Sequence, residues 1–166
     1  AGLRFLTGHP IRELRISHLK NCSINELVQC LSAWSQRNLE TLSVRQCSFT
    51  RCYKQPCFVL NLMHLANLRE LDVSYTDFNN HGLEIVADDL PLLTRLNISV
   101  TKVTTLGPLR RAATRLLHLA AHNVAGSCYD EAVLADLRSL RTLDVSDSRA
   151  YLDLSDNLGQ FLHKFA

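Results

Sequence analysis

The sequence predicts an α/β solenoid of about six repeats, because one strand signature recurs along the whole chain. The signature, L-x-x-L-x-[LIV], is read six times in 166 residues, with Ala121 in place of the last aliphatic residue of the fifth copy. Its start-to-start spacings are 28, 29, 25, 23 and 24 residues, within the roughly 20 to 29 residues typical of leucine-rich repeats. The six copies begin at Ile11, Leu39, Leu68, Leu93, Leu116 and Leu140. We therefore predict a right-handed leucine-rich-repeat domain.

Each signature is expected to form one strand of a curved parallel sheet. Side chains alternate between the two faces of a strand, so the fourth and sixth positions point inward together, and the first position turns in from the preceding loop. One repeat cannot bury that face alone, so neighbouring repeats stack over a continuous core. The sheet then forms the concave side, and the returning segments form the convex side.

Several of the returns are predicted to be helical. Residues 24–31 follow Ser23, which makes a capping-box pattern with Glu26, and residues 80–90 follow Asn79 and stop at Pro91. A further helical pattern runs from 154 to 165. Gly107-Pro108 weakens a helix in the fourth repeat, which is expected to return by a shorter, less regular path.

The composition fits a single domain over residues 1–166, since 46% of residues are hydrophobic and 20% are charged. We expect the chain to be a piece of a longer protein, because neither end carries the polar cap that a solenoid needs. The net charge of +2 gives no basic stripe for nucleic acid, and no apolar run approaches the roughly 18 residues of a membrane span. Neither nucleic acid nor membrane is therefore expected as a partner.

Six cysteines raise the questions of disulfides and of metal binding. Cys22 and Cys47 are assigned to a core-facing slot after the strand, which Thr76 and Thr101 fill in the next repeats, so buried free thiols are expected. The run from Cys47 through Cys52 to Cys57 lacks the second ligand pair usual in structural zinc sites. We predict no metal and no cofactor.

No catalytic group can be assembled from the motifs. His118 and His122 lie on one strand about 13 Å apart, and Asp72 and Asp144 lie about 14 Å apart on strands three places apart. These separations are too long for one ion or for a carboxylate pair. The sequence therefore predicts a binding domain and not an enzyme.

The candidate binding surface is the concave face, formed by the third, fifth and seventh signature positions. This face is polar and mixed in sign, and these positions include no Trp or Tyr. It can be a partner site or a contact with a neighbouring part of the same protein. The candidate contacts are Glu13, Arg15, Arg45, Glu70, Asp72, Arg95, Asn97, His118, His122 and Asp144.

The wording of the later strands adds a resemblance. LRELDVSYTDF (68–78), LTRLNISVTKV (93–103) and LRTLDVSDS (140–148) share L-x-x-L-[DN]-[IV]-S, and the first two continue it as S-x-T. This series, with the short fourth repeat that leads into RLLHLAAHNV, resembles the leucine-rich region of the Zyg-eleven and Zer-one family. The first two repeats match it only loosely, and D-[IV]-S strands also occur in other leucine-rich proteins.

The resemblance implies a substrate receptor of cullin-two ubiquitin ligases, a class of cullin-RING ligase. In that family a preceding segment recruits elongins and cullin-two, and a following segment captures substrates with small amino-terminal residues. Neither segment matches any part of this chain, so no such contact is assigned to a residue here. The implied compartment is the cytoplasm, with the nucleus as a second. The alternative is a ribonuclease-inhibitor-like module for ligand binding or sensing, suggested by the longer, Cys-bearing first repeats.

Overall fold

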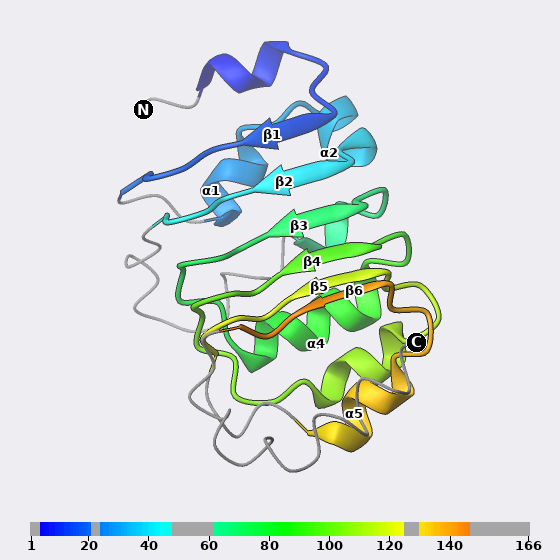
Figure 1. Cartoon of the computed structure of the whole chain (residues 1–166). Helices are drawn as coiled ribbons and strands as arrows, with labels where there is room; N and C mark the ends of the chain where they lie inside the picture. The colour runs from blue at the N-terminus through cyan, green and yellow to red at the C-terminus, as the bar shows by residue number, and fades with distance from the viewer. Residues whose placement is uncertain (1–3, 21–23, 48–61, 125–129, 147–166) are drawn as a thin grey trace.

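A computed structural model of the chain describes residues 4–20, 24–47, 62–124 and 130–146. Six three-residue strands lie side by side in chain order and form one parallel sheet (Figure 1). The strands are β1 (Glu13–Arg15), β2 (Thr41–Ser43), β3 (Glu70–Asp72), β4 (Arg95–Asn97), β5 (His118–Ala120) and β6 (Thr142–Asp144). Each begins at the third position of a signature, so the predicted solenoid of about six repeats is confirmed.

The repeats stack without a shift in register. The fourth-position leucines pair directly from strand to strand: Leu14, Leu42, Leu71, Leu96, Leu119 and Leu143. The first five are at most 8% exposed, and Leu143 packs against the same core from its edge. This stacking gives the continuous apolar core that the periodic leucines predict.

A left-handed residue ends each of the first five strands at the eighth signature position. These residues are His18, Gln46, Tyr75, Val100 and Asn123, with φ between 48° and 58°. In three repeats the fifth-position side chain accepts the backbone N–H of the seventh residue: Asp72 from Ser74 (2.9 Å), Asn97 from Ser99 (3.0 Å) and Asp144 from Ser146 (3.1 Å). The [DN]-[IV]-S wording is therefore the sequence of this turn.

The ninth position closes the turn. Thr76 and Thr101 each donate a hydroxyl hydrogen bond, at 2.6 Å, to the carbonyl of the sixth-position residue. Cys47 fills the same slot as a buried free thiol, as predicted, and burial raises its pKa. Counting from the left-handed residue His18 puts Leu19 in this slot of the first repeat. Cys22, which the sequence assigned to this slot, lies outside the described residues.

The returns become helices of different lengths and types. The α-helices are α1 (Ile24–Gln29), α2 (Ala33–Asn38), α4 (Asn80–Asp89) and α5 (Glu131–Asp136), and the 3-10 helices are η1 (Arg4–Gly8), η2 (Leu62–His64) and η3 (Gly107–Ala112). The helix α4 begins after Asn79, whose side chain accepts the N–H of Gly82, as predicted. The short path expected from Gly107-Pro108 is the 3-10 helix η3. The pattern from 154 to 165 and the loop that holds Cys52 and Cys57 lie outside the described residues.

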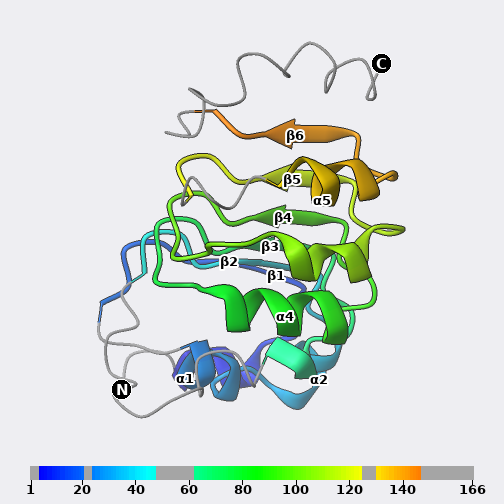
Figure 2. The same ribbon diagram turned by 90° about the horizontal axis from the view of Figure 1, so that it is seen from below.

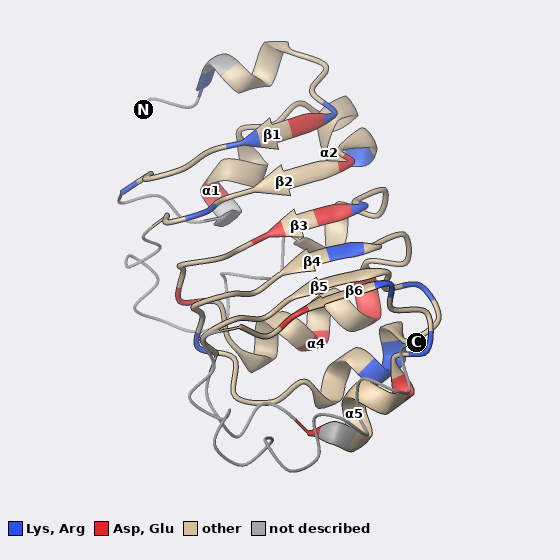
Figure 3. Cartoon of the chain, in the orientation of Figure 1, with Lys and Arg blue, Asp and Glu red and all other residues tan. Residues whose placement is uncertain are grey.

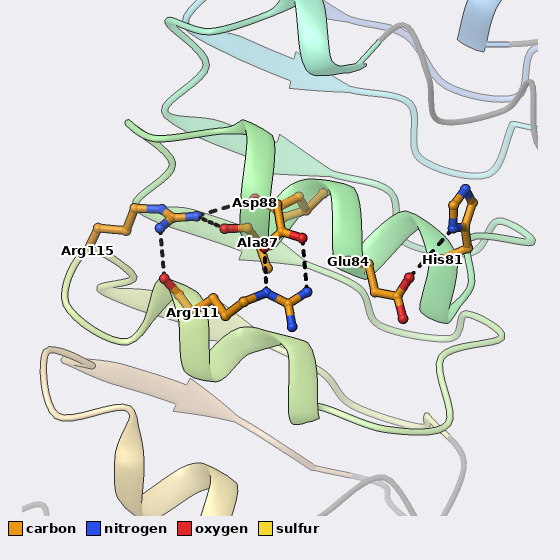
Figure 4. A network of polar contacts seen from close by, with 7 residues as sticks. His81, Glu84, Ala87, Asp88, Arg111 and Arg115 are labelled. Carbon is orange, nitrogen blue, oxygen red and sulfur yellow. Dashed lines mark hydrogen bonds and ion pairs between the residues drawn. The ribbon is translucent and has the colours of Figure 1, made fainter.

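Polar contacts tie the convex elements of neighbouring repeats together (Figure 4). Arg111 of η3 donates to both carboxylate oxygens of Asp88 in α4, and Arg110 pairs with Asp136 of α5 at 2.9 Å. Arg115 donates to the carbonyl of Ala87 in the last turn of α4. Burial lowers the pKa of the Arg115 guanidinium, and the nearby Asp88 carboxylate partly offsets this effect. A cation here satisfies helix carbonyls that have no partner within the helix.

We expect Arg115→Met to lower the free energy of unfolding by about 1 kcal/mol, because the carbonyl of Ala87 loses a charged donor. Arg138→Met is the matched control, because the Arg138 side chain is exposed and makes no hydrogen bond or ion pair with the described residues. Urea unfolding of both variants measures the difference. Equal stability of the two variants would show that the Arg115 contacts contribute nothing.

Candidate functional site

The sheet has one face covered by helices and one face without them. Figure 2 shows α1, α2 and α4 together on the covered side. On the other side, a hollow of about 260 Å³ lies over β3, β4, β5 and β6, so this side is concave. Acidic and basic positions are interspersed across the strands (Figure 3). The predicted partner contacts are therefore examined on this concave, helix-free face of the sheet.

On the first three strands an ion pair covers part of this face. Arg15 of β1 and Glu70 of β3 pair at 3.0 Å, although β2 lies between their strands. Thr41 and Ser43 of β2 are consequently only 8% and 9% exposed. These two residues are the third and fifth positions of the second signature, which the sequence assigns to the concave face, and in the structure both are buried.

The seventh position also differs from the prediction. Ser74 and Ser99 were assigned to the open concave face, yet both are buried. The left-handed turn that follows bends the chain at this point, so the alternation of the strand no longer holds. The Ser99 hydroxyl accepts the backbone N–H of His122 at 3.3 Å. Ser74 and Ser99 thus pack inside the turn region, whereas Arg45 and His122 reach its surface, as do Ser17 and Ser146 of the first and last repeats.

An aromatic platform lies where the strands end, and the sequence did not predict it. The guanidinium of Arg45 lies 5.2 Å from the ring centre of Tyr75, and the His122 ring meets Tyr75 edge-on at 6.1 Å between centres. Tyr75 is 39% exposed. Repeats two, three and five contribute these residues, and the small Ser99 lies in the repeat between the last two. We call Arg45, Tyr75 and His122 the aromatic platform. The sequence signal for the aromatic platform is Tyr75, an aromatic residue at the eighth signature position.

Three of the predicted contacts already serve the turns. Asp72, Asn97 and Asp144 each use one side-chain oxygen to accept a backbone N–H. Asp144 also accepts the Ser146 hydroxyl at 2.7 Å. The hydroxyl and amide of Ser146, with a smaller effect from His122, hold the pKa of Asp144 below its ordinary value against the effect of burial. Its other oxygen has no partner among the described residues.

The lowered pKa of Asp144 predicts a pH dependence of stability. A carboxylate whose folded pKa is below its unfolded pKa stabilises the fold above the unfolded value, near 3.8, and this contribution is lost as the pH falls through the folded pKa. Unfolding free energies of the parent chain and Asp144→Asn should therefore converge as the pH is lowered from 6 toward 2. A difference that stays constant over this range would contradict the assignment.

The remaining candidate contacts differ in their exposure and in whether another side chain already binds them. Arg95 and Glu13 are exposed, and the structure shows no ion pair for either among the described residues. His118 is half-buried and shares a 2.8 Å hydrogen bond with Thr142. Their role as partner contacts stays a prediction, and Arg95 is the most available cation of the hollow.

The described part of the chain shows no group of three or more His, Cys, Asp or Glu residues that could hold a metal ion. His64, which follows the cysteine run in sequence, lies exposed in η2. Within the same residues, none of the helices has the length and apolar character needed to cross a bilayer. What the concave face offers is hydrogen bonds, charge and one aromatic surface.

No protein-family model matches the chain. In structure it is similar to internalin C2 of Listeria monocytogenes, with a TM-score of 0.63 and 20% identity over 87% of this chain and 54% of that chain. It is also similar to a second internalin (inlF) of that organism, with a TM-score of 0.58 and 17% identity over 81% of this chain and 34% of the other. The chain thus spans about half and about a third of their lengths. These likenesses and the six-stranded sheet show that the fold is a leucine-rich-repeat solenoid.

Proposed function

We propose that the chain is a protein-interaction domain that binds its partner through the concave face. The aromatic platform is the observation that carries this proposal. Trp, Tyr and Arg are the residues most enriched at the energetic centres of protein interfaces, and here the exposed Tyr75 contacts both Arg45 and His122. The helix-free face beside it presents Arg95 without an internal ion pair among the described residues. Such a surface suits the recognition of another protein.

We further propose that this domain belongs to a substrate-recognition subunit of a cullin-two ubiquitin ligase and works in the cytoplasm. The support is the wording of the strands, L-x-x-L-[DN]-[IV]-S, which resembles the Zyg-eleven and Zer-one family. In this role the solenoid separates an elongin-binding segment from a substrate-binding segment, and its contribution to ubiquitin transfer is positioning. The free buried thiol of Cys47 fits a reducing compartment.

The ligase proposal is tested by affinity capture from cell lysate, with this chain and its full-length parent protein as parallel baits. We expect elongins and cullin-two to be captured by the parent and not by the 166-residue chain, because the implied binding segment lies outside it. Their absence from both captures would refute the ligase role and leave the concave-face proposal intact.

Tyr75→Asn tests the platform with little strain, because Asn123 occupies the equivalent left-handed turn position in the fifth repeat. Loss of an interface aromatic anchor typically costs about 2 kcal/mol or more, or about 30-fold in affinity. We expect that weakening for the partner of the parent protein, measured by titration calorimetry, with the melting temperature nearly unchanged.

Met63→Ala in η2 is the matched control, since Met63 is equally exposed, at 44%, but lies among the returns. Unchanged affinity in Tyr75→Asn, or an equal loss in the control, would place the interface elsewhere.

A further inference from the structure

The hollow on the concave face is lined by one small residue among longer polar ones. In the row of fifth-position residues from β3 to β6, the side chains are Asp72, Asn97, Ala120 and Asp144. Ala120 stands between two longer polar side chains and lines the hollow of about 260 Å³. A lysine or arginine side chain has a long apolar stem and a compact charged end, which suits a hollow whose lining is more apolar than polar.

The charges around Ala120 favour a cation. Strand spacing of about 4.8 Å places Asp144 next to Ala120 and Asp72 about 10 Å away, whereas Arg95 lies diagonally at about 8 Å. Because Coulomb energy falls as the inverse of distance, the two carboxylates outweigh the guanidinium at this point. Glu70 also lines the hollow, but Arg15 neutralises it at 3.0 Å. His118 also lines the hollow and shares its hydrogen bond with Thr142.

The polar atoms needed to hold a cation are available. The backbone N–H and the hydroxyl of Ser146 both donate to the same oxygen of Asp144, and the other oxygen has no partner among the described residues. The amide oxygen of Asn97 accepts a single hydrogen bond, from Ser99, and a carbonyl oxygen can accept two. These oxygens flank Ala120 from the two neighbouring strands.

We infer that a Lys or Arg side chain of a partner protein occupies the hollow, with its stem over Ala120 and its charged end between Asp144 and Asn97. This inference rests on the proposed concave-face interaction and specifies the chemistry of the partner. It commits to a basic partner segment, and an acidic segment bound at Arg95 is the competing outcome.

Residues found at the equivalent position of other repeats can be substituted to change the charge of the hollow while the hydrogen bond of the turn is retained. Asp144→Asn retains an oxygen for the Ser146 N–H, as Asn97 does for Ser99. Asn97→Asp adds a carboxylate to the hollow and copies Asp72 and Asp144. Ala120→Leu fills the hollow at a position that is half-exposed, outside the core.

The probe is a phage-displayed library of random dodecapeptides, selected on the full 166-residue chain and counter-selected on Ala120→Leu. We expect the selected peptides to share one Lys or Arg position. Synthetic peptides should then bind Asp144→Asn about tenfold more weakly and Asn97→Asp several-fold more tightly. Melting curves show whether each variant is folded.

Selection of acidic peptides, or of none, would overturn the inference, as would undiminished binding to Asp144→Asn. None of these results bears on elongin and cullin-two capture, which tests the ligase role separately. If Tyr75→Asn leaves the affinity for the partner of the parent protein unchanged while the peptides behave as expected, the proposal for the aromatic platform is refuted and the inference about the hollow is supported.

Discussion

Leu71→Asp is expected to unfold the domain. Leu71 is the fourth-position residue of β3, has no exposed surface, and pairs with Leu42 and Leu96 on the neighbouring strands. An aspartate there buries an unpaired charge in the centre of the stacked core. The cost is expected to exceed about 4 kcal/mol, most of the stability of a typical domain. Thermal and urea unfolding followed by circular dichroism measure it.

Asp72→Ala is the control for that prediction, because Asp72 is the next residue and lies on the opposite face of the same strand. It loses the turn hydrogen bond from Ser74 and is expected to cost only about 1 kcal/mol. If the two variants prove equally destructive, the assignment of faces to β3 is wrong.

Phe78→Ala is expected to have the second largest effect, about 3 to 5 kcal/mol, because it leaves a cavity in the core. Phe78 has no exposed surface, and its ring lies against Gly82 of α4, where an added β-carbon would be 2.5 Å from the ring. The ring thus joins the turn after β3 to the helix. Urea unfolding measures the loss.

Leu92→Ala is the control for Phe78→Ala, since Leu92 is a large apolar residue that is 38% exposed. Its truncation is expected to cost well under half as much. Comparable losses would show that Phe78 is not a central core residue.

The periodic leucines were sufficient to predict the sheet, because burial on one face forces a period of two within each strand. They could not predict the covering of Thr41 and Ser43. That covering depends on Arg15 and Glu70, which are 55 residues apart in sequence. The covering is determined by the order of three strands and by the side-chain conformations of Arg15 and Glu70. Neither can be predicted from a local sequence pattern.

The helices were predicted where their apolar spacing is long enough. The ten-residue α4 has a long run of apolar residues at helical spacing. The six-residue α2 has no such run, and the buried residue of α2 is Ser35. The Ser35 hydroxyl accepts the N–H of Ile11 and donates to the carbonyl of His9. This helix is held by polar contacts to the chain at the start of the first repeat, so hydrophobic periodicity could not reveal it.

The candidate site was predicted in part. The third- and fifth-position residues do line the concave face over β3 to β6. The aromatic platform was missed because the alternation of a strand ends at the left-handed residue, and Tyr75 is that residue. A sequence analysis that also follows the turn position from repeat to repeat would find it.

The most direct test of the concave-face account compares two sets of substitutions in the parent protein. The concave set is Arg45→Ser, Tyr75→Asn and His122→Ser, each a residue that other repeats of this chain carry at the same position. The control set on the returns is Met63→Ala, Leu92→Ala and Arg138→Ala.

Affinity for the partner of the parent protein is measured for each set after melting curves have shown that both are folded. The account predicts that the concave set loses binding, by about 100-fold or more if the platform is an interface centre, and that the control set retains it. Binding retained by the concave set and lost by the control set would contradict the account and assign the interface to the returns.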